Sequence, residues 1–209
     1  MKVAIVGTGN MGTGLGRQFA AAGHEVIVGS RDPERAKAKA EEIGAVGHGS
    51  YADAIAQADA FLLAVNWWDI DETFPELGNV AGKILIDCTN PYTDNTYSTP
   101  ANLGGRSAAD VIQERLPGAR VVKAWNHVYA QVVSSSPDFG GQAASVLLAS
   151  DDVEAKEIVA GLARDAGYDP VDAGPLWSAF NVEKVAAAMI TIAYVVGTGT
   201  NQALKIIRR

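Results

Sequence analysis

The sequence has little cysteine, little basic charge and no long apolar run, and each shortage excludes a class of protein. Cys88 is the single cysteine among 209 residues, so an internal disulfide is excluded and a reducing compartment is expected. Lysine and arginine number 17 against 24 aspartates and glutamates, and the net charge of −7 argues against a nucleic-acid-binding surface. We also expect no metal site, and we interpret Cys88 as a buried residue at a strand end.

Segments that would direct the chain to a membrane are also missing. The residues before Gly7 are too few for the apolar core of a signal peptide. The longest apolar stretch, Val185 to Val196, is about half as long as a membrane span, and we interpret it as a buried helix. We therefore expect a cytoplasmic protein without membrane contact.

The most informative motif that is present follows the apolar run Val3 to Val6. Gly7, Gly9 and Gly12 form a G-x-G-x-x-G pattern between this predicted strand and a helical pattern that starts near Asn10. Glycines at this spacing allow a tight turn, a close approach of the backbone to a pyrophosphate, and close packing of the helix on the strand. The motif therefore predicts a dinucleotide-binding loop at the start of a helix.

The residues after the second predicted strand, 25–29, indicate which dinucleotide is preferred. An NAD site usually has an acidic residue there, whereas this chain has Ser30 and Arg31, with Arg35 one helical turn later. Two guanidinium groups are suited to the 2'-phosphate of NADP. A solvated basic helix start is the alternative interpretation.

Strand and helix patterns alternate along the chain, which predicts parallel pairing with right-handed crossovers. We expect an α/β fold, a doubly wound Rossmann sheet of parallel strands with a small C-terminal α+β addition. The predicted domains are 1–150 and 151–209. Further strands are expected near 45–46 and at 60–65, 83–87, 120–124, 145–149 and 169–172.

A long loop is expected at the ligand end of the sheet, and two helices are expected at the C-terminus. The loop from Tyr92 to Arg106 lacks periodicity and is long enough to be a lid or a substrate loop. After Pro175 we predict a long apolar helix to about Val196 and a short tail helix to Ile207. The apolar residues of the long helix spread around it, so we favour a homodimer over a monomer.

Four segments, GTGNMGTGL, VGSRDPERA, IDCTNPY and VDAGPL, occur in this order along the chain. They resemble the coenzyme F420-dependent NADP oxidoreductase family over essentially the whole chain, and the cytosolic reductase domain of the STEAP metalloreductases is similar. The resemblance implies hydride transfer between NADP(H) and a deazaflavin (F420) or flavin-like ring.

The resemblance also implies a set of binding residues. Those expected around the pyrophosphate are Gly7, Thr8, Gly9, Asn10, Met11 and Gly12. Those expected at the 2'-phosphate are Ser30, Arg31 and Arg35, and those at the nicotinamide ribose are Val65, Asn66, Asn90 and Pro91. The second ring is expected near Asn126, His127, Val128 and the turn Gly174-Pro175-Leu176. Asn126 departs from the family, whose archaeal deazaflavin-using members have a histidine there, so the hydride partner stays open.

Two other functions remain open on the sequence alone. An NADPH-dependent reductase of a small carbonyl or imine would need a proton donor. Its catalytic candidates are His127 and Tyr129, with Tyr92 and Lys184 behind them. A non-catalytic NADP-binding sensor protein is the third reading, because hydride transfer between two rings requires no acid or base.

Overall fold

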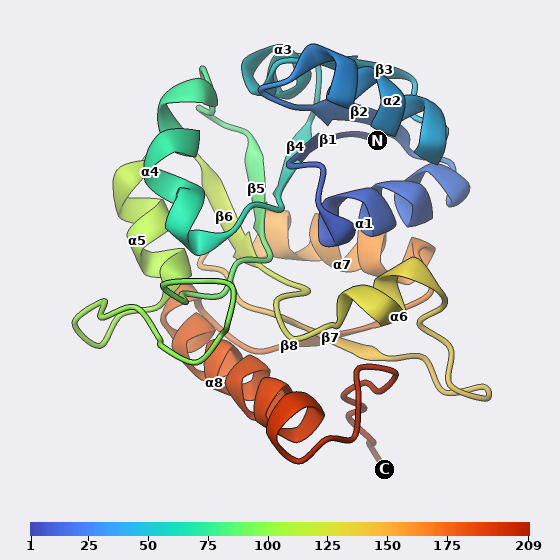
Figure 1. The fold of residues 1–209 in the computed structure, drawn as a ribbon, viewed down its shortest axis with the longest axis vertical. Coiled ribbons are helices and arrows are strands. Elements are labelled where there is room, and N and C mark those ends of the chain that lie inside the picture. The colour runs from blue at the N-terminus through green and yellow to red at the C-terminus, as the bar shows by residue number, and fades with distance from the viewer.

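The computed structural model describes residues 1–209 and contains a six-stranded parallel sheet (Figure 1). Its strands are β1 (Lys2–Val6), β2 (Glu25–Gly29), β3 (Gly47–Gly49), β4 (Ala60–Leu63), β5 (Ile84–Asp87) and β6 (Arg120–Lys123). The strand order is β3-β2-β1-β4-β5-β6, so the winding direction reverses between β1 and β4. This is the order of a doubly wound Rossmann sheet, whose ligands bind outside the carboxyl ends of the strands near the reversal.

Helices cover both faces of this sheet. They are α1 (Asn10–Ala21), α2 (Pro33–Ile43), α3 (Tyr51–Ala56), α4 (Ile70–Thr73), α5 (Ala108–Arg115), α6 (Ala130–Ser134), α7 (Val153–Asp165) and α8 (Ala179–Ile190). Alternate strand residues point to opposite faces, which gives two cores. Val3 and Ile5 pack with α1, α2, α6 and α7, whereas Ala4 and Val6 belong to the core shared with α3, α4, α5 and the start of α8. Figure 1 shows α4 and α5 on one side of the sheet and α1 on the other.

A second, smaller sheet follows the Rossmann strands. β7 (Ser145–Leu148) and β8 (Asp169–Asp172) pair in parallel and are connected by α7. An isolated bridge between Lys123 and Ala149 connects this pair to the end of β6. The predicted α/β fold with a small addition is confirmed. The division at residue 150 stays a prediction, because one core contains residues from both sides of it.

The C-terminal tail differs from the prediction. No helix extends to Ile207, and the residues after 200 follow the edge of β7 in an irregular conformation. The Ser145 amide donates to the Leu204 carbonyl at 2.8 Å, and the Ile206 amide donates to Ser145 Oγ at 3.0 Å. Lys205 pairs with Asp169 at 2.7 Å. The free edge of β7 bonds to this segment through the amide and the hydroxyl of Ser145, and an extended tail can reach both groups whereas a helix could not.

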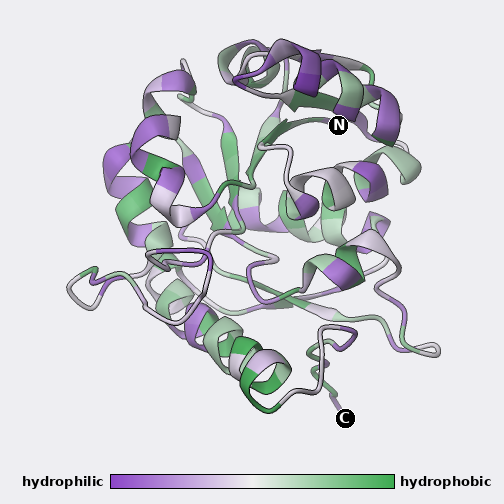
Figure 2. Cartoon of the chain, viewed as in Figure 1, coloured by the Kyte–Doolittle hydropathy of each residue, from purple (hydrophilic) through white to green (hydrophobic).

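The last long helix also differs from the prediction of a buried element. α8 ends at Ile190 and continues as a π-helical turn, Thr191–Val195. Only one face is covered, through residues such as Val182 and Ala186, while Val195 is 80% exposed. Figure 2 shows hydrophobic colouring at the outer end of α8. By length and composition alone Leu176–Val195 could cross a membrane, and 39% of its most apolar 18-residue window is buried within the protein.

Candidate functional site

The glycine loop after β1 is shaped to receive a ligand on one side. Gly7 has φ of 109°, and a Cβ there would lie 2.3 Å from the Ala64 carbonyl oxygen. A Cβ on Gly12 would lie 2.2 Å from the Gly7 carbonyl oxygen, so this glycine lets α1 approach the strand. A Cβ on Gly9 would meet no protein atom within 4 Å. The open side of the loop is therefore at Gly9, where α1 begins without a side-chain cap and its first amides are free for a pyrophosphate.

The end of β2 brings the second group of predicted residues together. Ser30 is buried, and its Oγ accepts from the Asp32 amide at 3.1 Å. Asp32 in turn caps α2 by accepting from the amides of Glu34 and Arg35. This arrangement fixes where α2 starts, and so it fixes the position of both arginines.

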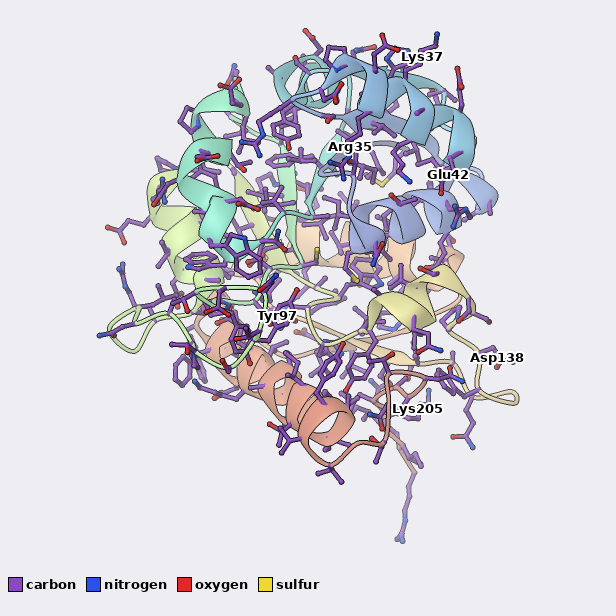
Figure 3. The ribbon with its side chains drawn as sticks, in the orientation of Figure 1. Arg35, Lys37, Glu42, Tyr97, Asp138 and Lys205 are labelled. Atoms are coloured by element: carbon purple, nitrogen blue, oxygen red, sulfur yellow. The ribbon has the colours of Figure 1, made fainter.

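The two arginines differ in their surroundings. Arg31 pairs with Glu72 of α4 at 3.0 Å, and both side chains are exposed. Figure 3 shows Arg35 on the side of α2 that faces α1, whereas Lys37 points away from the molecule. Guanidinium groups at the end of β2 suit a 2'-phosphate beside an adenosine ribose. Glu72 holds Arg31 in an ion pair that a phosphate would have to replace.

A cavity of about 330 Å³ lies at the carboxyl ends of the central strands. Its walls come from the glycine loop, from the segments after β4, β5 and β6, and from the end of α8. Ten of the site residues expected from the sequence line it: Gly9, Asn10, Met11, Val65, Asn66, Asn90, Asn126, His127, Val128 and Tyr129. None of the 21 lining residues is an aspartate, glutamate, lysine or arginine. The cavity therefore suits an uncharged aromatic ring next to the site for the pyrophosphate.

Aromatic side chains from four parts of the chain line this cavity. They are Trp67 and Trp68 after β4, Tyr97 of the long loop, Tyr129 after β6 and Tyr194 of the π-helical turn. The rings of Trp68 and Tyr97 have centroids 6.1 Å apart. Tyr97 has φ of 54°, an uncommon conformation for a tyrosine. Sequence reasoning missed Tyr97 and Tyr194, because nothing in a loop or at a helix end shows which residue folds back over a site.

The polar residues of the cavity are held by hydrogen bonds. Asn90 Nδ2 donates to the Asn126 carbonyl at 2.6 Å, and Asn126 Nδ2 donates to Asn90 Oδ1 at 3.0 Å. His127 Nε2 lies 3.2 Å from the Ser145 carbonyl oxygen. Burial lowers the pKa of His127 to about 4, so its ring is neutral at pH 7.

The other candidate reactive groups are occupied or distant. The Tyr129 hydroxyl donates to the Met189 carbonyl of α8. The Cys88 thiol is buried, donates to the Leu63 carbonyl, and has its pKa raised to about 12 by burial, as expected for a packing residue. Lys184 is exposed and lies over the Phe180 ring at 4.7 Å, outside the cavity.

Some predicted contacts lie elsewhere in the fold. Pro91 and Lys184 line a neighbouring cavity of about 260 Å³ between the long loop and α8. The turn Gly174-Pro175-Leu176 does not line the main cavity. It is held instead by Asp151, which accepts from the Leu176 amide at 2.9 Å. The structure therefore does not bring this turn together with the other residues expected near the second ring.

A buried charged cluster contacts the segment after β5 that lines the cavity, and it was not predicted from the sequence. Lys123 Nζ lies 3.0 Å from Asp87 Oδ2 and 2.9 Å from Glu183 Oε1, and it donates to the Thr89 carbonyl at 2.6 Å. Glu183 also accepts from the Ala108 amide at 2.9 Å, at the start of α5. The cluster fixes the segment after β5, which contributes Cys88, Thr89 and Asn90 to the cavity.

Comparisons with known proteins point to one family. A family model described as NADP oxidoreductase coenzyme F420-dependent matches residues 2–91. The F420-dependent NADP reductase of Methanothermobacter thermautotrophicus is 34% identical over 212 residues, which cover 92% of this chain and 89% of the relative. A crystal structure from Arthrobacter sp. FB24, provisionally assigned as an F420-dependent NADP reductase, has a TM-score of 0.87 and 30% identity over the full length of both chains.

A second group of relatives is longer. Metalloreductase STEAP3 of Rattus norvegicus is 30% identical over 184 residues, which cover 88% of this chain but only 36% of the relative. This chain thus spans about a third of the length of the STEAP protein it matches. The archaeal relative matches along nearly its whole length, and the family model that matches residues 2–91 of this chain is described as that of an NADP oxidoreductase. On this match, together with the Rossmann fold and its glycine loop, the chain belongs to the coenzyme F420-dependent NADP oxidoreductase family.

Proposed function

We propose that this NADP-dependent oxidoreductase transfers a hydride between NADP(H) and a deazaflavin (F420) or flavin-type ring in the main cavity. The observation that carries the proposal is an uncharged cavity, bordered by aromatic side chains, directly beside the open side of the glycine loop. Bound NADPH supplies the hydride from its nicotinamide ring. Two flat rings held face to face need position and exclusion of water, and they need no acid or base.

The chain's own residues divide the binding between two regions. The open side of Gly9 and the amides of α1 would hold the pyrophosphate, while Ser30, Arg31 and Arg35 would hold the 2'-phosphate. Trp68 and Tyr97 would flank the second ring and keep water away from the transfer. These roles rest on position and on the chemistry of the side chains.

The alternative of a carbonyl or imine reductase is weakened by the state of its candidate proton donors. His127 is neutral, and its one ring hydrogen faces a backbone carbonyl. The Tyr129 hydroxyl is bonded to α8. Neither residue is placed to donate a proton to a substrate in the cavity.

The proposal is tested by mixing the protein with NADPH and either F420 or FMN and following the nicotinamide absorbance. We expect turnover with at least one of the two rings. The Gly9→Ala variant should lose most of this activity, because its methyl group fills the space on the ligand side of the loop. Gly161→Ala is the matched control: Gly161 lies in α7, its Cβ would also meet no atom within 4 Å, and its activity should be unchanged.

Failure to reduce any ring acceptor, with NADPH binding intact, would contradict the proposal. Turnover of a small ketone or imine under the same conditions would favour the alternative reductase instead. Equal activity of the Gly9→Ala and Gly161→Ala variants would show that the pyrophosphate is not held at Gly9.

We also propose that two copies associate through the outer face of α8 and its π-helical turn. The exposed apolar residues gathered there are Ile192, Tyr194, Val195 and Val196. Tyr194 also lines the cavity, so a second copy on this face would contact a residue of the site. A cytoplasmic location remains our expectation.

A further inference from the structure

One of the two arginines proposed to hold the 2'-phosphate of NADP is already paired with a carboxylate. Arg31 Nη1 donates to Glu72 Oε2 at 3.0 Å, and the two residues are 41 positions apart in the sequence. Their side chains are 50% and 74% exposed, so a ligand from solvent can reach both of them. A bound 2'-phosphate and Glu72 would therefore compete for the same guanidinium group.

The other charged groups near the end of β2 leave this pair isolated. Arg35 forms no ion pair, and Figure 3 shows it on the side of α2 that faces α1. Asp32 lies closer in the sequence, but its carboxylate accepts from the amides of Glu34 and Arg35 as the cap of α2. Glu72 is thus the carboxylate that pairs with a guanidinium group of this region.

The position of Glu72 is set by α4. Ile70 and Thr73 of this helix are buried, at 3% and 1% exposure, so the two residues between them lie on its outer side. Asp71 pairs with Arg115 of α5 at 2.6 Å, which holds the helix on the opposite side from the end of β2. With α4 anchored in this way, the Glu72 carboxylate is kept within reach of Arg31.

The charge of the ligand decides whether this ion pair survives binding. A 2'-phosphate is an anion that Arg31 would bind by forked hydrogen bonds, and the Glu72 carboxylate would then have to turn away from the like charge. A ribose with a free 2'-hydroxyl is uncharged, and it leaves the ion pair in place. Glu72 should therefore weaken the binding of NADP and leave that of NAD unchanged.

We infer that Glu72 is a specificity-determining residue that reduces the preference of this chain for the 2'-phosphorylated dinucleotide. The acid of an NAD site usually follows the second strand, where this chain has Ser30 and Arg31. Here the acid comes from α4 and pairs with an arginine of the phosphate site. The inference rests on the 2'-phosphate site of the proposed function, but not on the identity of the hydride acceptor.

The expected effect is moderate, because exposed ion pairs are screened by water and salt. Glu72→Gln should bind NADP⁺ about fivefold more tightly than the unaltered protein at low ionic strength. Its affinity for NAD⁺ should change less than about twofold. In about 1 M NaCl the gain for NADP⁺ should also fall below about twofold, since the Debye length is then only about 3 Å.

Isothermal titration calorimetry with NADP⁺ and NAD⁺ measures these affinities. Adenosine 2',5'-bisphosphate is a third probe, because it has the 2'-phosphate but no nicotinamide, and it should show the same gain as NADP⁺. Asp71→Asn is the matched control. It removes the same charge from the neighbouring residue of α4, whose carboxylate pairs with Arg115 and not with Arg31, and its affinity for NADP⁺ should be unchanged.

A second background separates competition for Arg31 from a general change in charge. Arg31→Gln should bind NADP⁺ more weakly than the unaltered protein. Adding Glu72→Gln to it should recover less than about twofold, because no guanidinium group is left at this position for the phosphate and the carboxylate to share.

A gain for NADP⁺ that is absent for NAD⁺, in Asp71→Asn and in the Arg31→Gln background supports the inference. An unchanged affinity of Glu72→Gln for NADP⁺ overturns it, and so does an equal gain for both dinucleotides or a full gain in the Arg31→Gln background. These titrations require no turnover. A protein that reduces neither F420 nor FMN but shows the gain would overturn the proposed hydride acceptor and leave the inference standing.

Discussion

At the scale of single residues, the cavity is characterised more by polar side chains that are already hydrogen-bonded than by free reactive groups. Three groups of the cavity that could act as acids, a hydroxyl, a thiol and an imidazole, are each bonded to a backbone carbonyl. Tyr129 is bonded to Met189, Cys88 to Leu63, and His127 to Ser145. Such a site positions ligands by shape and hydrogen bonding.

The neutral state of His127 should make stability depend on pH. Its folded pKa is about 4 against an ordinary value of 6.5, so the unfolded chain binds a proton that the folded chain does not. This contribution to stability is fully present above pH 6.5 and is lost as the pH falls toward 4, up to about 3 kcal/mol. Between pH 7 and pH 5 the free energy of unfolding should fall by about 2 kcal/mol more in the natural protein than in His127→Gln. Urea denaturation at both pH values measures this, and parallel losses in the two proteins would contradict it.

Residues whose role is imposed by the backbone could be predicted from the sequence, whereas those that depend on distant chain segments could not. The positions of Gly7, Gly9 and Gly12 follow from a turn that only glycine permits. Tyr97 and Tyr194 reach the cavity because a long loop and a π-helical turn fold back over it. No spacing rule in the sequence describes such an arrangement.

At the scale of elements, the buried charged cluster connects four of them. Lys123 lies on β6, Asp87 on β5 and Glu183 on α8, while Glu183 accepts from the first amide of α5. Burial raises the pKa of Glu183, which shows that its charge is costly in this environment. The cluster is therefore a device that sets the position of α8, more than a source of net stability.

Removing the cation from this cluster should be strongly destabilising. Lys123→Met leaves the carboxylates of Asp87 and Glu183 buried without their partner and should cost about 3–5 kcal/mol of unfolding free energy. Adding Glu183→Gln should restore part of the loss, because the neutral amide can still accept from the Ala108 amide. Chemical denaturation of the three proteins provides the measurement. A double variant no more stable than Lys123→Met would show that lost packing, and not an unpaired charge, dominates.

Predicted elements with a continuous apolar pattern were placed more accurately than those without one. The strands predicted at 60–65 and 83–87, which have continuous apolar runs, form at Ala60–Leu63 and Ile84–Asp87. The strand predicted near 45–46 forms instead at Gly47–Gly49, a segment with no apolar pattern that pairs only at the edge of the sheet. The predicted tail helix was wrong because those residues form a hydrogen bond with β7, an edge strand far away in the sequence.

At the scale of the whole molecule, the alternation of strands and helices was enough to predict the sheet, but it did not predict which helix faces are covered. An apolar helix was expected to be buried, and the π-helical turn that continues α8 leaves Ile192, Tyr194 and Val195 exposed. Hydrophobic composition shows that a surface needs covering. It does not show whether the same chain or a second copy covers it.

The proposed association through α8 predicts a dimer that one substitution disrupts. Val195→Asp places a charge on the exposed apolar face and should give a monomer in light scattering at micromolar concentration. Val153→Asp is the matched control, since Val153 is also exposed, at 74%, but lies at the start of α7. It should remain a dimer. A natural protein that is already monomeric at this concentration would reject the proposed association.

The absence of charged side chains from the cavity has a thermodynamic consequence. The ring of oxidised nicotinamide is cationic and that of the reduced form is neutral, so a fixed charge in the wall would favour one redox form over the other. A wall without fixed charge exerts no such Coulombic preference. Such a wall also offers the cationic ring no partner when that ring is buried, so a nicotinamide bound there should be easier to reduce than in solution.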